Sequence, residues 1–439
     1  MRNKWIVASV LIVALIVICV ASLFAAWQGM RLAQGSGIRF TGSGFGVDQV
    51  SAQATEEKTV NVTQPVNLSA VTDHGNITVH AGKDGQVTVK AEKIAYGNSD
   101  ADAQAALKGL KVVIAQDGKN LKVSVDQSIE VSPLHIGPVG GTVNFTITVP
   151  ADSAVTLNSR QGDLILSGIS GNADLKTTFG SLNIADVTGD VSATSDNGNI
   201  TAENIGASGQ VTLSSDFGSF AVENVRGSDV TLSSRNGQMI GLKNISATGL
   251  LKITNDFGDI HLAGGQAKVL QISSKNGAIG LETINVDDRL TAKSDFGNLT
   301  VSGVNANAYD LNTRNGKISL DGGRDSIKAH SDFGSIEVLN AKAATVDLSS
   351  NNGAVTFSGS LGNGPHTIHS DFGNIQVTLP AESKLNLDLQ TNFGKIVSDF
   401  SITINGTIDS NHWIGTINGG GAAFAVVTKN GNITLQSSK

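Results

Sequence analysis

The chain contains little cysteine, proline or aromatic residue, and each scarcity excludes a class of protein. Of its 439 residues one is cysteine, Cys19, so the rest of the chain can form neither disulfides nor Cys-based metal or redox sites. Proline accounts for only 6 residues and aromatics for 5 %, which together with the abundant glycine suits a β architecture with many tight turns. Binding to nucleic acid requires a clustered basic face, and the net charge of -7 argues against one. We therefore expect no nucleic-acid partner.

Glycine is abundant, with 51 residues, and thirteen glycines mark an internal repeat. Each of the thirteen stands between two runs in which apolar and polar residues alternate. The copies are 18 to 21 residues apart. The repeat glycines are Gly162, Gly180, Gly198, Gly218, Gly237, Gly258, Gly277, Gly297, Gly316, Gly334, Gly353, Gly373 and Gly394.

Three columns of the aligned repeat predict its fold. The residues two after and five before the glycine are apolar in every copy, and the residue three before it is Ser or Thr except at Asn255. Alternation of this kind predicts two strands with one buried face around a glycine turn. A unit of about 20 residues cannot bury that face alone, so the copies must stack. We expect an all-β, single-stranded parallel β-solenoid, right-handed and roughly 60 Å long at a strand spacing of about 4.8 Å.

The residues just before the glycine suggest how the coils stack. From Phe179 onward the preceding residue alternates between Phe and Asn. The residue before that alternates in charge across seven copies, Asp216, Arg235, Asp256, Lys275, Asp295, Arg314 and Asp332. Stacked coils of about 20 residues would place opposite charges side by side, which is favourable. The alternative, a coil of about 39 residues, would place Asp on Asp.

The N-terminal residues predict export and attachment. Residues 1–4 carry Arg2 and Lys4, and the uncharged apolar run 5–27 is long enough to cross a bilayer. Because positive charge stays inside, we expect residues 1–4 in the cytoplasm and the bulk of a single-pass protein outside the cell membrane. A cleaved signal peptide is the alternative, but its apolar core is normally shorter. Residues 28–57, rich in Gly, Ser, Ala and Gln, predict a flexible tether.

Residues 58–150 predict a separate β-rich cap, and residues 151–439 the solenoid. In the cap, candidate strands are 60–62, 77–80, 87–91, 112–114, 121–125 and 143–149, and Asp100 to Leu110 predicts a short helix. This α+β module would cover the open edge of the first coil. Beyond Gly394, we expect Gly415 and Gly431 to mark the last two coils.

The chemistry-bearing residues predict no catalytic, cofactor or metal site. Five Asp-Phe-Gly triplets recur with the repeat and indicate turns. His330 and His369 share a repeat position two coils apart, about 10 Å, which is too far for one metal ion. His366, three residues from His369, should face the other side of its strand. Because the carboxylates are spread along a ridge, a polysaccharide-acting β-helix enzyme, which needs them gathered, is disfavoured.

The chain resembles a bacterial adhesin-like family described as a β-strand repeat, domain of unknown function 4097, and the related head-domain autotransporter-adhesin module. The residues that carry the likeness are 143–150, Leu157, 162–164 and serial copies such as 196–200. The resemblance implies an extracytoplasmic β-solenoid, often membrane-tethered, with suspected roles in adhesion or envelope stress. It supplies no catalytic residues.

These observations favour a non-enzymatic binding or structural protein of the bacterial cell envelope. Outward columns of Ser, Thr, Asn and Asp could bind cell-wall or surface glycans, or envelope proteins, through many weak contacts. The alternative is an accessory or sensor protein for envelope stress. The membrane is an expected partner through the single N-terminal span, while the ligand and the oligomeric state are open.

Overall fold

The computed structural model describes residues 39–41, 44–46, 50–62, 65–127, 140–405 and 409–438. They form two compact units: the smaller comprises residues up to Glu56, Ala91–Val112 and Val125–Val143, and the larger Glu57–Lys90, Val113–Ser124 and Asn144–Lys439. The expected cytoplasmic segment 1–4 and membrane span 5–27 lie outside the described residues. Among the residues described, no helix has the length and apolarity needed to span a bilayer.

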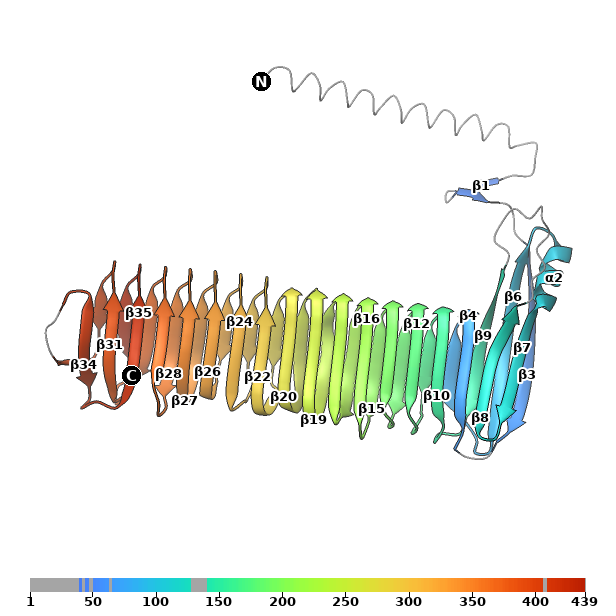
Figure 1. Cartoon of the computed structure of the whole chain (residues 1–439), viewed down its shortest axis with the longest axis horizontal. Coiled ribbons are helices and arrows are strands. Elements are labelled where there is room, and N and C mark those ends of the chain that lie inside the picture. Colours follow the sequence, from blue (N-terminus) through green and yellow to red (C-terminus); the bar gives the residue numbers. More distant parts are fainter. Residues whose placement is uncertain are drawn as a thin grey trace, which may run out of the picture. The chain divides into compact units, whose positions relative to one another are not determined.

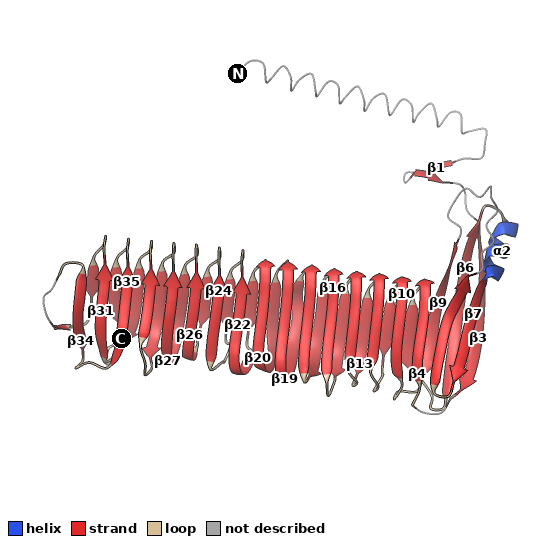
Figure 2. Ribbon diagram, viewed as in Figure 1, coloured by secondary structure: helices blue, strands red, loops and turns tan. Residues whose placement is uncertain are grey.

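The smaller unit contains the helix that the sequence predicted. Helix α2 spans Asp100–Gly109, and the Ser99 side chain caps it by accepting a hydrogen bond from the Asp102 backbone. The helix is coloured blue in Figure 2. It buries Ala103 and Leu107. Parts of the strands β3 (Val50–Asn61), β6 (Gln86–Gly97) and β7 (Leu110–Asp117) also belong to the smaller unit, and β1 (Arg39–Thr41) pairs with β2 (Gly44–Gly46).

Part of the segment predicted to be a flexible tether forms a strand. The tether was expected to end at residue 57, but β3 begins at Val50. Ala52 on this strand is buried. The polar composition of the segment concealed a strand because most of its side chains face solvent.

The larger unit is a stack of coils (Figure 1). Its strands belong to one continuous sheet, in which two runs of parallel strands, here called the first and the second sheet, enclose an apolar core. Strands β19, β20 and β27 run through a corner and belong to both sheets. In stack order, the first sheet contains β8 (Asn120–Gln127), β4 (Asn67–His74), β10 (Ala154–Gln161), β12 (Ala173–Phe179), β14 (Val191–Asn197), β16 (Gln210–Phe217), β18 (Asp229–Asn236), β19 (Met239–Phe257), β20 (Ile260–Asn276), β22 (Asn285–Ser294), β24 (Ala308–Thr313), β26 (Arg324–Ser331), β27 (Ile336–Ser350), β29 (His366–Ser370), β35 (Ala422–Thr428) and β31 (Leu385–Thr391). The second contains β9 (Gly140–Val149), β5 (Ile77–Ala81), β11 (Leu164–Ser167), β13 (Leu182–Val187), β15 (Ile200–Gly206), β17 (Phe220–Gly227), β19, β20, β21 (Ile279–Glu282), β23 (Leu299–Ser302), β25 (Ile318–Asp321), β27, β28 (Val355–Leu361), β30 (Ile375–Pro380), β36 (Ile433–Ser438) and β32 (Ile396–Ser398).

The strand register shows a coil of about 20 residues. Phe179 pairs with Asn197, and Asn197 pairs with Phe217, so paired residues are 18 and 20 positions apart. The parallel β-solenoid is confirmed, and the alternative coil of about 39 residues is wrong. The two apolar columns fill the core, as at Leu157, Leu175 and Leu182, which are fully buried. Burial of each such side chain contributes about 1.5–3 kcal/mol, so stability accumulates coil by coil.

The stack begins earlier than the repeat glycines indicated. Strands β4 and β5, within the expected cap, form a coil around Gly75 and pair with β10 and β11 of the Gly162 coil. This coil obeys the same columns, with Thr72 three before the glycine and Ile77 two after it. The segment between Gly75 and Gly162 is much longer than the 18 to 21 residues that separate the other repeat glycines, so the regular spacing did not indicate the Gly75 coil.

The C-terminal coils stack in a different order from their order in sequence. Strands β35 and β36, around Gly431, lie between the Gly373 coil and the Gly394 coil (Figure 1). The prediction that Gly415 marks a coil is wrong, because β34 (His412–Ile417) runs antiparallel to β31 and pairs with β33 (Thr403–Ile404). Strand β34 thereby covers the edge of β31, which would otherwise present unpaired backbone groups.

Candidate interaction surface

The turn glycines approach one another so closely that no side chain fits between them. A Cβ atom added to Gly316 would lie closer than 3.0 Å to the carbonyl oxygen of Gly297, and the same holds from coil to coil up to Gly394, which meets Gly431. Most of these glycines have ordinary backbone angles. Glycine is therefore required here by close backbone approach.

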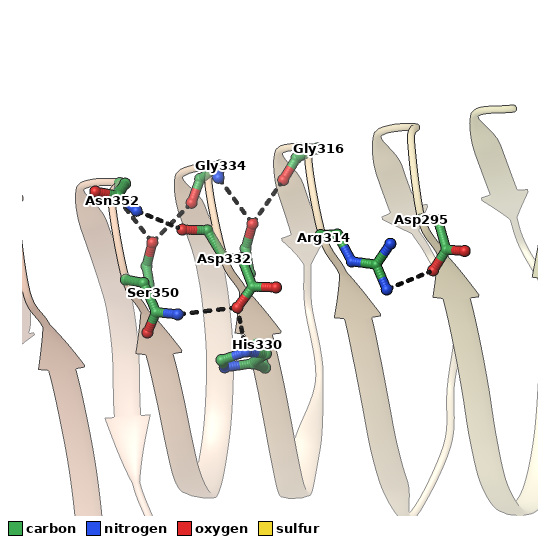
Figure 3. Close-up of polar contacts among 11 residues, drawn as sticks. Asp295, Arg314, Gly316, His330, Asp332, Gly334, Ser350 and Asn352 are labelled. Atoms are coloured by element: carbon green, nitrogen blue, oxygen red, sulfur yellow. Dashed lines mark hydrogen bonds and ion pairs between the residues drawn. The ribbon is translucent and has the colours of Figure 1, made fainter. Parts of the chain in front are cut away.

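The Ser/Thr column forms a ladder of buried hydrogen bonds beneath these turns. The Ser331 hydroxyl donates to the carbonyl oxygen of Gly316 at 3.0 Å, and Ser350 donates to Gly334 at 2.9 Å (Figure 3). Asn255, the exception to the column, uses its amide Nδ2 to donate to the Gly237 carbonyl at 2.7 Å. Each hydroxyl that donates in this way satisfies a carbonyl group at the turn. Ser234 is the exception, because its buried hydroxyl has no hydrogen-bond partner.

The residues two before the glycine form a row of ion pairs along the outside of the turns. Arg235 lies 3.1 Å from Asp216, and Lys275 lies 2.8 Å from Asp256. Arg314 is 3.9 Å from Asp295. Figure 3 shows this ion pair. The sequence predicted this attraction between successive coils. The side chains are half-exposed, so each pair contributes only a few tenths of a kcal/mol to stability.

The phenylalanines of the turns point into solvent and form what we call the aromatic ridge. Their exposed fractions lie between 51 % and 76 %. They occupy every second coil, so neighbouring rings are about 10 Å apart along the stack. The aromatic ridge consists of Phe179, Phe217, Phe257, Phe296, Phe333, Phe372 and Phe393.

The inserted C-terminal coil preserves the alternation along this ridge. In sequence order Phe372 and Phe393 would be neighbours, and the pattern of Phe and Asn would break. In the structure the Gly431 coil lies between them, so Asn430 separates the two phenylalanines. The same coil places Lys429 2.8 Å from Asp371 and extends the alternation of charge.

A second row of polar side chains, the amide row, lies at the corner where the second-sheet strands end. Asn204, Asn224 and Asn244 have positive φ angles of 50° to 56°, a conformation that Asn tolerates better than most residues. Asn244 donates to Asn224 Oδ1 at 3.2 Å, Asn224 donates to Asn204 at 3.4 Å, and Asn204 donates to Asp186 at 3.2 Å. The apolar columns of the repeat do not predict this row, although its asparagines recur at steps of 20 residues.

The amide row lines an open groove of about 550 Å³ that follows the stack. Arg226, Ser246 and Gln266 add polar groups to its wall. Within the amide row, Asn204 and Asn224 each use one N–H and one lone pair in bonds to their neighbours. A second N–H donor and further acceptor capacity remain on each of these two amides. The groove can therefore hydrogen-bond groups that both donate and accept.

The histidines lie on the sides of their strands that the repeat positions predict. His330 and His369 lie at the surface beside Asp332 and Asp371, at 3.2 Å and 2.9 Å. His366 faces the opposite side and is buried, and burial lowers its pKa. In the part of the chain that the structure describes, no three His, Cys, Asp or Glu side chains gather so as to hold a metal ion.

The chain matches one protein family and is similar to solved structures, of which two are given below. The family Toastrack DUF4097 matches residues 67–295 and 265–436. A Bacteroides fragilis protein provisionally named an adhesin is 19 % identical, with a TM-score of 0.35 over 52 % of this chain and 96 % of that one. A Clostridium sporogenes protein provisionally named a cell adhesion protein is 8 % identical, with a TM-score of 0.17 over 88 % of this chain and 100 % of that one. These scores are too low to carry an argument about function. No curated protein matches the chain.

Proposed function

We propose that this chain, which belongs to the Toastrack family, is a non-enzymatic binding protein of the bacterial cell envelope. Its ligand would be an extended, hydroxyl-rich polymer, a cell-wall or surface glycan, lying along the amide row. The observation that supports this proposal is the groove of about 550 Å³, in which the side chains of Asn204, Asn224 and Asn244 repeat once per coil.

The chemistry of the groove suits a glycan. A sugar hydroxyl both donates and accepts, and so does the side-chain amide of each Asn in the amide row. One such hydrogen bond is worth only about 0.5–1.5 kcal/mol, but contacts repeated over several coils add up when one polymer spans them. The groove is open rather than enclosed, which suits a long chain better than a small molecule.

Attachment to the membrane through residues 5–27 is part of the same proposal. It rests on the uncharged apolar run that follows Arg2 and Lys4. The solenoid would then lie outside the cytoplasmic membrane, where envelope polymers are within reach. Protease added to intact cells without an outer membrane, or to spheroplasts, should cleave the chain. Full protection would contradict this orientation.

The test is retention of the full chain on purified peptidoglycan and on a glycan array. Replacing Asn204, Asn224 and Asn244 by glycine removes three amides but keeps the backbone conformation, since Gly168 and Gly264 adopt the same positive φ. Loss of three hydrogen bonds should weaken retention at least about tenfold. Asn340→Gly, at another positive-φ position outside the groove, is the matched control. Absence of retention of the unaltered chain, or full retention of the triple variant, would overturn the proposal.

A further inference from the structure

The aromatic ridge has a period of two coils, and so does the row of charges beside it. At a coil with Phe the flanking residue is Asp in most copies, as at Asp256 and Asp295, and at a coil with Asn it is mostly basic, as at Lys275 and Arg314. When two copies of a surface with this alternation face each other with an offset of one coil along the stack, the two surfaces are complementary. Each Phe then faces an Asn, and most of the Asp residues beside the Phe coils face an Arg or Lys.

We propose that the aromatic ridge is the contact surface between two copies of this chain. The two solenoids run antiparallel, with the twofold axis between the Gly297 coil and the Gly316 coil. This placement sets Asp295 of one copy opposite Arg314 of the other, and the reverse, as a twofold interface requires. Moving outward from the axis, it pairs Lys275 with Asp332, Arg235 with Asp371, and Asp216 with Lys429.

The shape of the ridge allows the two copies to interlock. Rings of one copy are about 10 Å apart along the stack, and the shorter Asn side chains lie between them. A ring from the second copy fits into each gap, about 5 Å from its neighbours along the axis, within the usual range for aromatic pairs. An even displacement would place ring on ring and Asp on Asp, so only an odd displacement is favourable.

The buried area is sufficient for a specific dimer. Six phenylalanines, Phe217 to Phe393, fall within the proposed overlap. Each would lose roughly 100 Å² of exposed ring surface, since a Phe buries about 150–250 Å² in full and these are half-exposed or more. Together they supply roughly 600 Å² per copy, and the flanking charged row brings this near the standard value of about 800 Å² per partner.

The test is the oligomeric state of the full chain in mild detergent, measured by sedimentation equilibrium. Replacing Phe257, Phe296 and Phe333 by Asn introduces the residue that the neighbouring coils already carry at this turn, so the fold should be retained. We expect a dimer whose dissociation constant rises at least about a hundredfold in the triple variant. Ile240→Asn, which removes an exposed apolar side chain away from the ridge, is the control and should remain dimeric.

Charge reversal and spin labels test the proposed alignment. Asp295→Arg should weaken the dimer because the introduced guanidinium would then face Arg314 of the other copy, and the double exchange with Arg314→Asp should restore most of the affinity. In a Cys19→Ser background, a single label at Asn315 should give a short distance between copies. A label at Asn236 should give about 34 Å along the axis, seven coil spacings. Equal short distances at both sites would contradict the antiparallel alignment.

Three outcomes would overturn the proposal. The first is a monomer at all accessible concentrations, and the second is a dimer unaffected by the triple Phe→Asn variant. The third is a monomer whose aromatic ridge is instead needed for retention on phosphatidylglycerol vesicles or on peptidoglycan, which would assign the ridge to lipid or glycan. Since the amide row is left intact in all these variants, glycan retention through the groove is tested separately.

Discussion

The side chain of Lys429 lies beside that of Asp371, with 2.8 Å between Nζ and Oδ1, although a complete coil separates the two residues in sequence. The hydrogen bond from Lys429 lowers the pKa of the Asp371 carboxyl. This pair exists because the last coil of the chain inserts between two earlier coils. The insertion continues the alternation of Phe with Asn to the last coil of the stack, and it places a base beside Asp371.

The inserted coil predicts a specific pattern of engineered disulfides. Ala425 pairs with Thr367 on one side and with Asp388 on the other. In a Cys19→Ser background, Ala425→Cys should form a disulfide with Cys at 367 or at 388, because adjacent strands bring the Cα atoms within bridging distance. Cys residues at 367 and 388 together, two strands apart at about 10 Å, should stay reduced. A bridge between 367 and 388 would show stacking in sequence order. Mass spectrometry after non-reducing digestion checks each pair.

The turn glycines predict where alanine cannot be accommodated. Gly316→Ala would press a methyl group against the Gly297 carbonyl, and the backbone cannot yield without breaking the stack. We expect a loss of about 3 kcal/mol or more in unfolding free energy, measured by urea denaturation. Gly206→Ala is the matched control, because the nearest atom to its added Cβ is a Thr188 methyl at 3.8 Å. Equal effects of the two substitutions would contradict close stacking of the turns.

The buried hydroxyls predict a smaller cost. Ser331→Ala removes the donor to the Gly316 carbonyl and the acceptor for the Gly334 backbone N–H. Leaving these groups unpaired should cost about 1–3 kcal/mol in the same denaturation experiment. Ser326→Ala changes an exposed hydroxyl on the same strand and should cost much less. A Ser331→Ala variant as stable as Ser326→Ala would show that the ladder does not stabilise the fold.

His366 predicts that stability falls in mild acid. Burial lowers its pKa from the usual 6.5, and its Nε2 lies 3.1 Å from the carbonyl oxygen of Gly362. The unfolded chain binds the proton more readily than the folded chain does. The contribution of His366 to stability is therefore fully present above about pH 6.5, and it is lost as the pH falls through the folded pKa. The melting temperature should therefore drop between about pH 7.5 and about pH 5.5, less so in His366→Leu. An identical drop in both proteins would contradict this role.

The repeat could be recognised in the sequence because each of its physical constraints restricts the residue type at a single position. Every coil needs a glycine where backbones touch, a hydroxyl or amide beneath it, and apolar side chains at fixed offsets. These requirements predicted the coil length, the core columns and the charge row correctly. The same columns could have found the Gly75 coil and rejected Gly415, which has His412 where the column requires Ser or Thr.

The order of the C-terminal coils and the position of the groove could not be read in the same way. Periodicity along the chain says which segments form coils, but stacking order is decided by edge complementarity in three dimensions. The break in alternation between Phe372 and Phe393 was the available sign. The amide row depends on positive φ angles at Asn204 and Asn224, which alternation of apolar residues does not reveal.

The most direct test of in-register stacking is the distance between spin labels at Asn236 and Asn352, measured by pulsed electron paramagnetic resonance in Cys19→Ser chains diluted with unlabelled protein. Six coil spacings separate the two positions, so we expect a narrow distribution near 29 Å along the axis. A distance near half that value, as a coil of about 39 residues requires, or a broad distribution, would contradict the stacked solenoid on which both proposed surfaces depend.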